Sequence, residues 1–467
     1  MGVRITQVKN LADPAAFAAH LESIGVDLPW HDEPSSQLAL PVTIRDGSAG
    51  DFTSPNRLAI LPMEGWDGTA DGRPTDLVRR RWGRFGDGGA GLVWGEATAV
   101  VPEGRANPNQ LVLNCETIDE FATLRGLLAD DQVAGLQLTH SGRYARPADR
   151  APRTAYVHSS LDEPSGASAS SVLSDDELDE LVATFVDAAA MVHEAGFDFV
   201  DVKACHGYLG HELLTAHDRP GRYGGDFAGR TRFMRSVIEG IRERVPSLAI
   251  AARISIFDLA PFRPGEGGVG ETTADGAYPY AFGGDGTGLG IDLTEPSLLF
   301  SMLEGLGVGL VSATAGSPYY VPHVQRPAYF PPSDGYRPPE DPLVGVARQL
   351  AATAELSRRH PDLVVIGSGY SYLQQWLPQV GAGAIAEGGA SMVGLGRMAL
   401  SYPDMPAAIL AGGDLESRLI CRTFSDCTTA PRAGLISGCF PLDPFYKDHE
   451  HRVELAAAKK ASRSRLG

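Results

Sequence analysis

The residue types best suited to chemistry are concentrated in one stretch near the middle of the chain. An apolar, β-branched run from Phe197 to Val202, typical of a buried strand, leads directly into a polar segment. Titratable groups released together at the carboxyl end of a buried strand are the usual way in which an α/β enzyme builds its active site. An amine, an imidazole and a phenol placed there can hold a substrate oxygen and move protons. The groups in this segment are Lys203, Cys205, His206 and Tyr208.

Composition limits the possible partners and compartments. Of the 467 residues 43% are hydrophobic, which is enough for a large core. The net charge of -18 and the pI near 5.1 argue against a nucleic acid or an anionic membrane as partner, because both require a basic face. The sequence has no apolar run of about 18 residues, and because its first ten residues lack the apolar segment of a secretory signal, we expect none. Its five cysteines fit reduced thiols better than a disulfide framework. We therefore expect a cytoplasmic protein with a small-molecule substrate, either monomeric or a homo-oligomer.

Apolar runs and helix-like segments alternate along the chain, which favours parallel strands joined by helical crossovers. The clearest helix has Ser174 as N-cap, acidic residues in its first turn and Gly196 as its stop. Eight β/α units form a (β/α)8 TIM barrel more naturally than an open sheet, with the site at the carboxyl ends of the strands. The predicted strands are Leu58–Leu61, Gly91–Trp94, Gly135–Leu138, Phe197–Val202, Ala249–Ile254, Val308–Ser312, Leu363–Ile366 and Ser391–Leu395. The predicted helices are Thr75–Phe85, Ile118–Leu128, Asp175–Glu194, Gly229–Arg244, Pro296–Leu306, Leu343–Arg359, Tyr372–Val380 and Pro403–Ala411.

Four segments extend or interrupt this α/β barrel. We divide the chain into an N-terminal extension (1–50), a barrel (51–445) and a C-terminal tail (446–467). Within the barrel, the stretch 261–291 is rich in Gly, Pro and Asp, and the stretch 316–342 is dense in Pro and Tyr. Inserted loops of this length are often lids or walls of a substrate site, with flexible surface excursions as the alternative.

The stretch that carries the polar groups resembles the corresponding segment of the old yellow enzyme family of flavin oxidoreductases. In that family a strand ends in a polar pair, followed by Gly-Tyr-Leu and later by Tyr-Gly-Gly and Arg-x-Arg-Phe. The resemblance extends over residues 55–445 and implies a divergent member, an FMN-binding TIM barrel with NADH or NADPH as electron donor. The matching elements are Lys203 with His206, Gly207 to Leu209, Tyr223 to Gly225, and Arg230, Arg232 and Phe233.

The resemblance also implies a flavin-binding edge formed by the first two strands. Pro62, Met63 and Glu64 stand where the family has residues beside flavin N5 and O4. Glu64 departs from the usual small polar residue, because a carboxylate would repel the charge of a reduced flavin unless it is protonated or paired. Glu96 and Ala97 occupy the family's second flavin wall.

Later strands are expected to hold the pyrimidine ring and the phosphate. Gln137 offers a carboxamide to the pyrimidine ring, and His140 and Arg143 lie in the same family motif with weaker roles. Arg253 matches the arginine that faces flavin N1 and O2, where a fixed cation stabilises the anionic hydroquinone. Glycine-rich turns and an arginine near the chain's end resemble the family's phosphate cradle. The cradle residues are Gly367, Ser368, Gly369, Gly396 and Arg397.

The polar pair departs from the family in its first member. Lys203 and His206 take the places of two imidazoles, or an imidazole and an amide, that bind the substrate's carbonyl or phenolate oxygen. A cationic lysine suits a carboxylate, enolate or phenolate better than a neutral enone, and a structural lysine paired with an acid such as Glu64 is the alternative. Tyr208 matches the proton donor to the substrate α-carbon, with a packed phenol as the alternative. Strand alternation points Cys205 away, as a packing residue.

Three cysteines beyond the last strand raise the question of a second cofactor. The gap from Cys427 to Cys439 resembles that between the last two iron–sulfur ligands of larger relatives, the 2,4-dienoyl-CoA reductase and trimethylamine dehydrogenase type. Those relatives supply four cysteines, whereas here Cys421 stands where two are expected. We interpret the three mainly as a remnant that caps the fold, with no metal, and keep a bound cluster as the less favoured alternative.

These features favour an FMN-dependent oxidoreductase that passes hydride from NAD(P)H through the flavin to an activated alkene, as an ene-reductase does. Tyr208 would protonate the α-carbon while Lys203 and His206 hold the activating oxygen. A first alternative is a dehydrogenase or demethylase that runs in the oxidative direction. A second is a barrel aldolase with a Schiff base on Lys203, which the flavin motifs disfavour.

Overall fold

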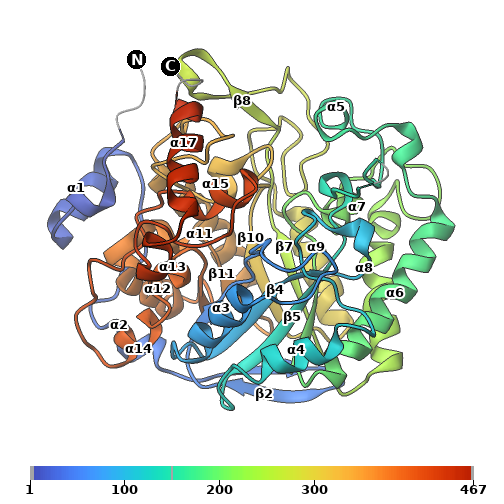
Figure 1. Ribbon diagram of the computed structural model, residues 1–467, viewed down its shortest axis with the longest axis horizontal. Coiled ribbons are helices and arrows are strands. Elements are labelled where there is room, and N and C mark those ends of the chain that lie inside the picture. The colour runs from blue at the N-terminus through green and yellow to red at the C-terminus, as the bar shows by residue number, and fades with distance from the viewer. Residues whose placement is uncertain (1–4, 149–150, 464–467) are drawn as a thin grey trace.

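A closed barrel of eight parallel strands forms the centre of the molecule (Figure 1). The computed structural model describes residues 5–148 and 151–463. Each barrel strand pairs with its neighbours in chain order, and the last pairs with the first through Val393 and Leu58. Every strand predicted from the sequence is present, so the TIM-barrel prediction is confirmed. The strands are β3 (Leu58–Ile60), β4 (Leu92–Ala99), β5 (Val133–Thr139), β6 (Phe199–Val202), β7 (Ala249–Ser255), β10 (Leu310–Thr314), β11 (Val364–Gly367) and β12 (Met392–Leu395).

Helices between the strands cover the outside of the barrel (Figure 1). The longest begins as expected, because the Ser174 side chain accepts from the backbone N–H of Glu177 and Glu177 reaches back to the N–H of Ser174. The crossover helices are α3 (Asp76–Gly86), α4 (Ile118–Arg125), α6 (Asp175–Glu194), α8 (Phe227–Arg244), α9 (Thr294–Gly305), α11 (Pro342–Arg359), α12 (Leu377–Ala386) and α14 (Met405–Leu410). None of the helices in the described ranges combines the length and apolarity that crossing a membrane demands.

One predicted helix, Tyr372–Val380, is wrong in its bounds and type. Tyr370–Trp376 forms a 3-10 helix in which Gln374 takes the non-helical angles φ 55° and ψ -117°. The α-helix α12 begins only at Leu377, where Pro378 stands in the first turn and its fixed φ suits a helix start.

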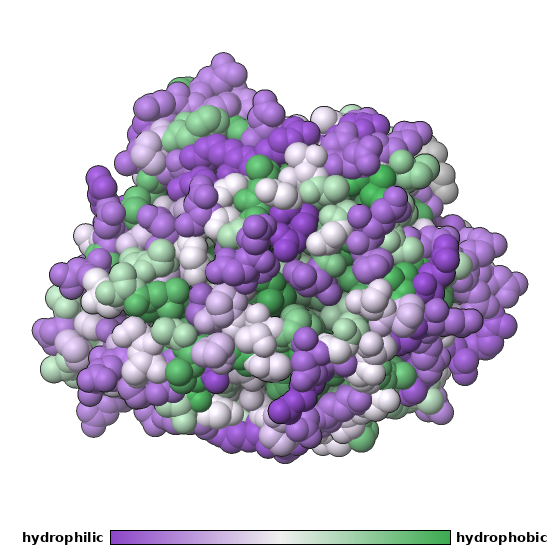
Figure 2. Space-filling model, turned by 90° about the horizontal axis from the view of Figure 1, so that it is seen from below, coloured by the Kyte–Doolittle hydropathy of each residue, from purple (hydrophilic) through white to green (hydrophobic). Residues whose placement is uncertain are grey.

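The amino end of the barrel is closed by a hairpin that the sequence analysis did not predict. Its strands are β1 (Val42–Asp46) and β2 (Gly50–Ser54), and Ile44 is fully buried among the residues that fill the barrel interior. Asp46 ties the hairpin to the barrel wall, since its carboxylate accepts from Arg242 and from the backbone N–H of Ile250. Figure 2 views the molecule from this side and shows apolar residues scattered among polar ones.

The carboxyl ends of the strands face the long loops and the C-terminal segment. The stretch 261–291 begins with a short hairpin of β8 (Phe262–Pro264) and β9 (Gly270–Thr272), and the stretch 316–342 contains α10 (Pro322–Gln325). After the last strand, α15 (Asp426–Arg432) lies against α17 (His451–Arg463) on the same side of the molecule (Figure 1). The remaining α-helices are α1 (Pro14–Ser23), α2 (Pro34–Leu38), α5 (Asp162–Ser165), α7 (Leu209–Leu214), α13 (Met398–Ser401) and α16 (Pro444–Lys447).

Candidate active site

A cavity of about 220 Å³ lies at the carboxyl ends of the barrel strands. Its walls come from strand ends, from the loop 316–342 and from α15, so segments far apart in the sequence meet there. The structure brings most of the sequence-predicted site residues together in this cavity. Those that line it are Pro62, Met63, Glu64, Gln137, Lys203, His206, Tyr208, Arg253, Ser368, Gly369, Gly396, Arg397 and Cys427.

Other sequence-predicted residues lie behind the cavity wall. The backbone carbonyl of Ala97 accepts from Gln110, and Gly367 is closely packed, because a Cβ there would lie 2.9 Å from the Tyr370 hydroxyl. Glu96 accepts from the Arg81 guanidinium at 2.7 Å and from the backbone N–H of Gly65 at 3.1 Å. It therefore steadies the turn that presents the neighbouring residue, Glu64. His140 and Arg143 also lie outside the lining.

Glu64 is the centre of a hydrogen-bonded cluster at one end of the cavity. Its Oε1 atom lies 2.8 Å from Lys203 Nζ, and its Oε2 atom accepts from Trp66 Nε1 at 2.9 Å and from the Tyr208 hydroxyl at 3.0 Å. Lys203 Nζ also lies 3.7 Å from the centre of the Tyr208 ring, a cation–π contact. The ion pair is almost fully enclosed, with 3% of the lysine side chain and 13% of the glutamate side chain exposed. The pairing that the sequence analysis weighed as an alternative for Lys203 is thus present.

Tyr208 carries a second hydroxyl contact on its other side. Its oxygen lies 3.0 Å from the hydroxyl of Tyr319, a residue of the loop 316–342. Burial, followed by the negative charge of Glu64, raises the pKa of Tyr208 well above its usual range. Tyr208 is therefore a neutral phenol at physiological pH and retains a proton that it can donate.

His206 is held in an unusual backbone conformation. Its φ of 64° lies in the left-handed region, which costs a residue other than glycine about 1–3 kcal/mol. Ser255 and Ser317 fix this conformation, because Ser255 Oγ accepts the His206 N–H at 3.0 Å and Ser317 Oγ donates to its carbonyl at 2.9 Å. The ring nitrogen Nε2 lies 3.3 Å from the Thr314 hydroxyl. Burial, and next the charge of Arg253, hold the pKa of His206 well below its usual range, so the ring is neutral.

The centre of the cavity floor is organised around a buried carboxyl group, Asp201. It accepts from the Gln137 carboxamide, from Trp94 Nε1 at 2.9 Å and from the backbone N–H of Arg253 at 2.8 Å. Burial raises the pKa of Asp201 to about 6. Since the Gln137 N–H₂ group faces Asp201, its carbonyl oxygen is the atom left to accept from a ligand. The Arg253 guanidinium donates to the Pro62 carbonyl at 2.9 Å, and its Nε has no partner among the described residues.

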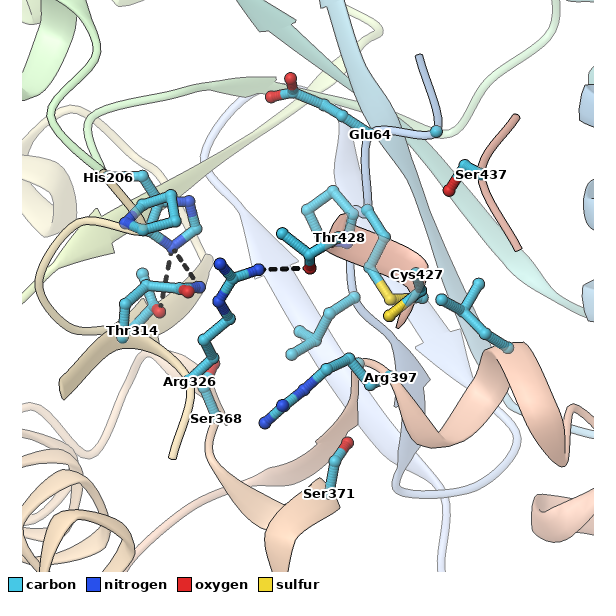
Figure 3. Close-up of a pocket in the computed structure, with 18 of the residues that line it drawn as sticks. Glu64, His206, Thr314, Arg326, Ser368, Ser371, Arg397, Cys427, Thr428 and Ser437 are labelled. Atoms are coloured by element: carbon cyan, nitrogen blue, oxygen red, sulfur yellow. Dashed lines mark hydrogen bonds between the residues drawn. The ribbon is translucent and has the colours of Figure 1, made fainter. Parts of the chain in front are cut away.

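The opposite end of the cavity is basic (Figure 3). Arg397 donates to the Pro327 carbonyl at 2.7 Å, and Arg326, from the same loop, donates to the Thr428 hydroxyl. Burial, and then the charges of Arg432 and Arg397, lower the pKa of Arg326 to about 9. Several buried donors here have no partner within the described chain, an arrangement suited to an anion. They are Arg326 Nε and Nη2, Arg397 Nη1 and Ser368 Oγ.

Sequence reasoning missed Arg326, Thr428 and Tyr319, although all three line the cavity. Two belong to the Pro- and Tyr-rich loop and one to α15, segments with no strand or helix periodicity that would have assigned them to a strand end. The only signal was compositional, since an arginine within a loop already expected to wall the site was a candidate for contacting a charged ligand.

The three C-terminal cysteines lie close enough to influence one another electrostatically. Burial, and next the charge of Cys421, raise the pKa of Cys427 to about 11. Burial, followed by the charges of these two residues, also raises the pKa of Cys439. None of the three forms a disulfide. In residues 5–148 and 151–463, no three His, Cys, Asp or Glu side chains gather as a metal site requires.

The donor set of the cavity fits FMN. A flavin mononucleotide has a doubly charged phosphate, for which the unpartnered donors of Ser368, Arg397 and Arg326 are suitable. Its pyrimidine ring has carbonyl oxygens and an N–H, which match the Arg253 guanidinium and the Gln137 carbonyl. At Gly369 the backbone has φ 96°, so the turn at the basic end depends on glycine.

Comparisons with known proteins agree with this arrangement. Residues 48–272 match the family described as NADH:flavin oxidoreductase / NADH oxidase. An NADPH dehydrogenase of Bacillus subtilis (strain 168) is 33% identical over 213 residues, 44% of this chain and 60% of that protein. The chain thus matches about 60% of the length of this relative.

Two solved structures share the fold over most of the chain. A 2-naphthoyl-CoA reductase in complex with 2-naphthoyl-CoA superposes with a TM-score of 0.66 at 17% identity, over 88% of this chain and 57% of that one. Histamine dehydrogenase from Rhizobium sp. 4-9 gives a TM-score of 0.65 at 21% identity, over 89% and 53%. The strand order and the site residues agree with the match of residues 48–272 to the NADH:flavin oxidoreductase / NADH oxidase family, so over this part the chain is similar to that family.

Proposed function

We propose that this protein is an FMN-dependent oxidoreductase that uses NADH or NADPH to reduce an activated alkene. The observation that carries the proposal is the polarity of one cavity, with unpartnered cationic donors at one end and the cluster of Glu64, Lys203 and Tyr208 at the other. When bound, FMN supplies a carrier that accepts hydride from the nicotinamide and delivers it to the substrate.

The residues of this chain supply binding and protons. Neutral His206, with Thr314 beside it, offers a polar site for the oxygen that activates the alkene. Lys203 is the second group able to hold that oxygen, and it does so as a partner in an ion pair rather than as a free cation. Tyr208 holds the proton that the α-carbon receives, and its hydroxyl must turn from Glu64 towards the substrate to deliver it.

A second candidate is the oxidative direction, as in a dehydrogenase or demethylase acting on an amine or alcohol. The Glu64 carboxylate favours it, because a proton acceptor in direct contact with Tyr208 can collect the proton that such a substrate loses. A Schiff-base aldolase is less favoured, since nucleophilic lysine must be a neutral amine and Lys203 is paired with a carboxylate at 2.8 Å. Five free thiols favour a reducing compartment such as the cytoplasm.

The experiment that tests this proposal asks first whether the protein binds FMN and then in which direction the reaction runs. Purified protein should carry or bind FMN, which NADH or NADPH should bleach anaerobically. Addition of 2-cyclohexenone should then restore the oxidised spectrum and yield cyclohexanone. A protein that fails to bind FMN contradicts the whole proposal. Bleaching by an amine or an alcohol, with no reoxidation by enones, contradicts the reductive direction and supports the second candidate.

A further inference from the structure

Tyr208 has little access to bulk water. Its side chain is 3% exposed, and it packs with Tyr144 in a small aromatic cluster against which Trp66, Tyr319 and Tyr320 lie. A residue this enclosed can give its proton to a substrate once, and the resulting phenolate must then be reloaded through a neighbour. The route of reloading is therefore a question about the groups that touch its hydroxyl.

The contacts of Tyr208 leave one neighbouring hydroxyl that can return a proton. Glu64 accepts from Tyr208 at 3.0 Å, and an ionised carboxylate has no proton to give. Lys203 faces the Tyr208 ring and not its oxygen, and Nζ donates to Glu64. The Tyr319 hydroxyl lies 3.0 Å from the Tyr208 hydroxyl and can act as a donor to it.

Tyr319 is placed to connect this oxygen with solvent. Its side chain is partly exposed, and it belongs to the loop 316–342 rather than to the barrel. The ring is held flat against Tyr144, with 3.9 Å between centroids and an interplanar angle of 6°. On its other flank the Arg432 guanidinium lies 5.7 Å from the ring centre. These contacts keep the hydroxyl directed at Tyr208 even though the loop carries no regular structure at this point.

We propose that Tyr319 relays protons from solvent to Tyr208, an inference that rests on the proposed reductive function. The substrate β-carbon receives hydride, and the α-carbon takes the proton as the Tyr208 O–H bond breaks. In the same step the Tyr208 oxygen accepts the proton of Tyr319, whose own O–H is then restored by water. The stoichiometry closes with one hydride from the nicotinamide and one proton from solvent per alkene reduced. Tyr319 acts through Tyr208 and is a positioning and relay residue, without contact to the reacting carbon.

The relay makes a specific prediction for Tyr319→Phe in the FMN-loaded enzyme. Reduction of the flavin by NADPH should keep its wild-type rate, because no proton passes through Tyr208 in that half-reaction. Reoxidation by 2-cyclohexenone should slow by about tenfold, the lower part of the range for loss of a proton-transfer group. In mixtures of H₂O and D₂O, the wild-type reoxidation rate should depend on the deuterium fraction along a curve, because two protons move in the same step. In Tyr319→Phe only one proton moves, so the dependence should be linear. High concentrations of a small buffer acid should restore part of the lost rate.

Matched variants separate a relay from a packing effect. Tyr329→Phe removes a hydroxyl from the same loop at a position outside the cavity lining and should leave every rate unchanged. Tyr319→His retains a ring that carries a proton and should react faster than Tyr319→Phe. Wild-type reoxidation and a curved deuterium dependence in Tyr319→Phe would overturn the relay alone. Failure of the wild-type enzyme to reduce any enone would overturn the proposed function, and the relay with it.

Discussion

The carboxylate of Glu64 and the ammonium group of Lys203 form an ion pair with 2.8 Å between Oε1 and Nζ, inside the cavity that the barrel strands build. The lysine thus meets a substrate with its charge already compensated. This changes the expectation that a cation at this position selects anionic ligands, because that selectivity now depends on whether Glu64 keeps its charge.

Replacement of Glu64 by Gln should unmask the lysine. A phenolate ligand such as 4-nitrophenolate should bind the FMN-loaded variant about tenfold more tightly, since an unpaired buried cation gains a new partner. The long-wavelength charge-transfer band of the phenolate–flavin complex, titrated with ligand, measures this. Lys203→Met should have the opposite effect and weaken the band. Equal phenolate affinity in all three proteins would show that Lys203 does not face the ligand.

Tyr208→Phe should separate the two half-reactions. Reduction of the flavin by NADPH should be unchanged, whereas alkene reduction should slow by about a hundredfold, because the proton donor is gone. Rapid-mixing absorbance spectroscopy follows both steps in the same sample. Undiminished alkene reduction would mean that water or another residue protonates the α-carbon.

Loss of either cavity arginine at the basic end should weaken cofactor binding. Arg397→Ala and Arg326→Ala each remove a partly buried guanidinium with unpartnered donors, and we expect FMN dissociation constants raised by about ten- to a hundredfold. Fluorescence quenching of FMN on titration with apoprotein gives the constants. Arg358→Ala, at an exposed position on α11, is the matched control and should bind as the wild type does. A normal constant for Arg326→Ala would assign that residue to the substrate instead.

The Arg253→Ala variant addresses the flavin's electronic tuning. The guanidinium beside Gln137 and Pro62 should stabilise negative charge on the reduced ring, so its removal should lower the two-electron potential or reduce FMN retention. Dye-equilibration titration of the holoenzyme measures the potential. Unchanged potential together with unchanged FMN content would contradict the assignment.

Stability should fall as the pH drops below about 6.5. Burial holds the pKa of six histidines below the usual value, so the unfolded chain takes up more protons than the folded one as the pH falls. Each such histidine costs the folded state about 1.4 kcal/mol per pH unit between the unfolded and folded pKa values. The histidines are His140, His158, His206, His211, His217 and His323.

Three buried carboxyl groups act in the opposite direction, since their raised pKa values make the folded state the stronger proton acceptor. They are Asp201, Glu212 and Asp258. Because the histidines outnumber them, the midpoint of urea unfolding should decrease between pH 7.5 and pH 5. A midpoint that is constant over this interval would mean that the histidines are accessible to protons in the folded state.

The barrel could be predicted from the sequence because its strands are fully buried and read as short apolar runs. Leu58 to Ile60 and Val364 to Gly367 are examples in which every residue is buried. The hairpin of Val42 to Ser54 escaped prediction for the converse reason, since most of its residues are exposed or partly exposed and Ile44 alone is not a pattern.

The site residues also fall into a group that the sequence could predict and a group that it could not. Lys203 and His206 follow one predicted strand and Arg253 lies near the carboxyl end of another, so their position was determined once the barrel was recognised. Tyr319, Arg326 and Thr428 reach the cavity through loop geometry and through a helix beyond the last strand, and no local rule connects such positions to a strand end. The ion pair between Lys203 and Glu64 was only partly predictable. The sequence placed both residues near the flavin, but only three-dimensional coordinates could decide whether they touch.

The hairpin that closes the amino end of the barrel affects how ligands reach the cavity. In the described residues Ile44 packs among the side chains that fill the barrel, and the cavity lies at the opposite, carboxyl ends of the strands. We therefore expect the electron donor and the electron acceptor to enter from this same face and to bind alternately. Steady-state rates measured at several fixed donor concentrations should give parallel double-reciprocal lines, and a large excess of either compound should inhibit by blocking the way for the other.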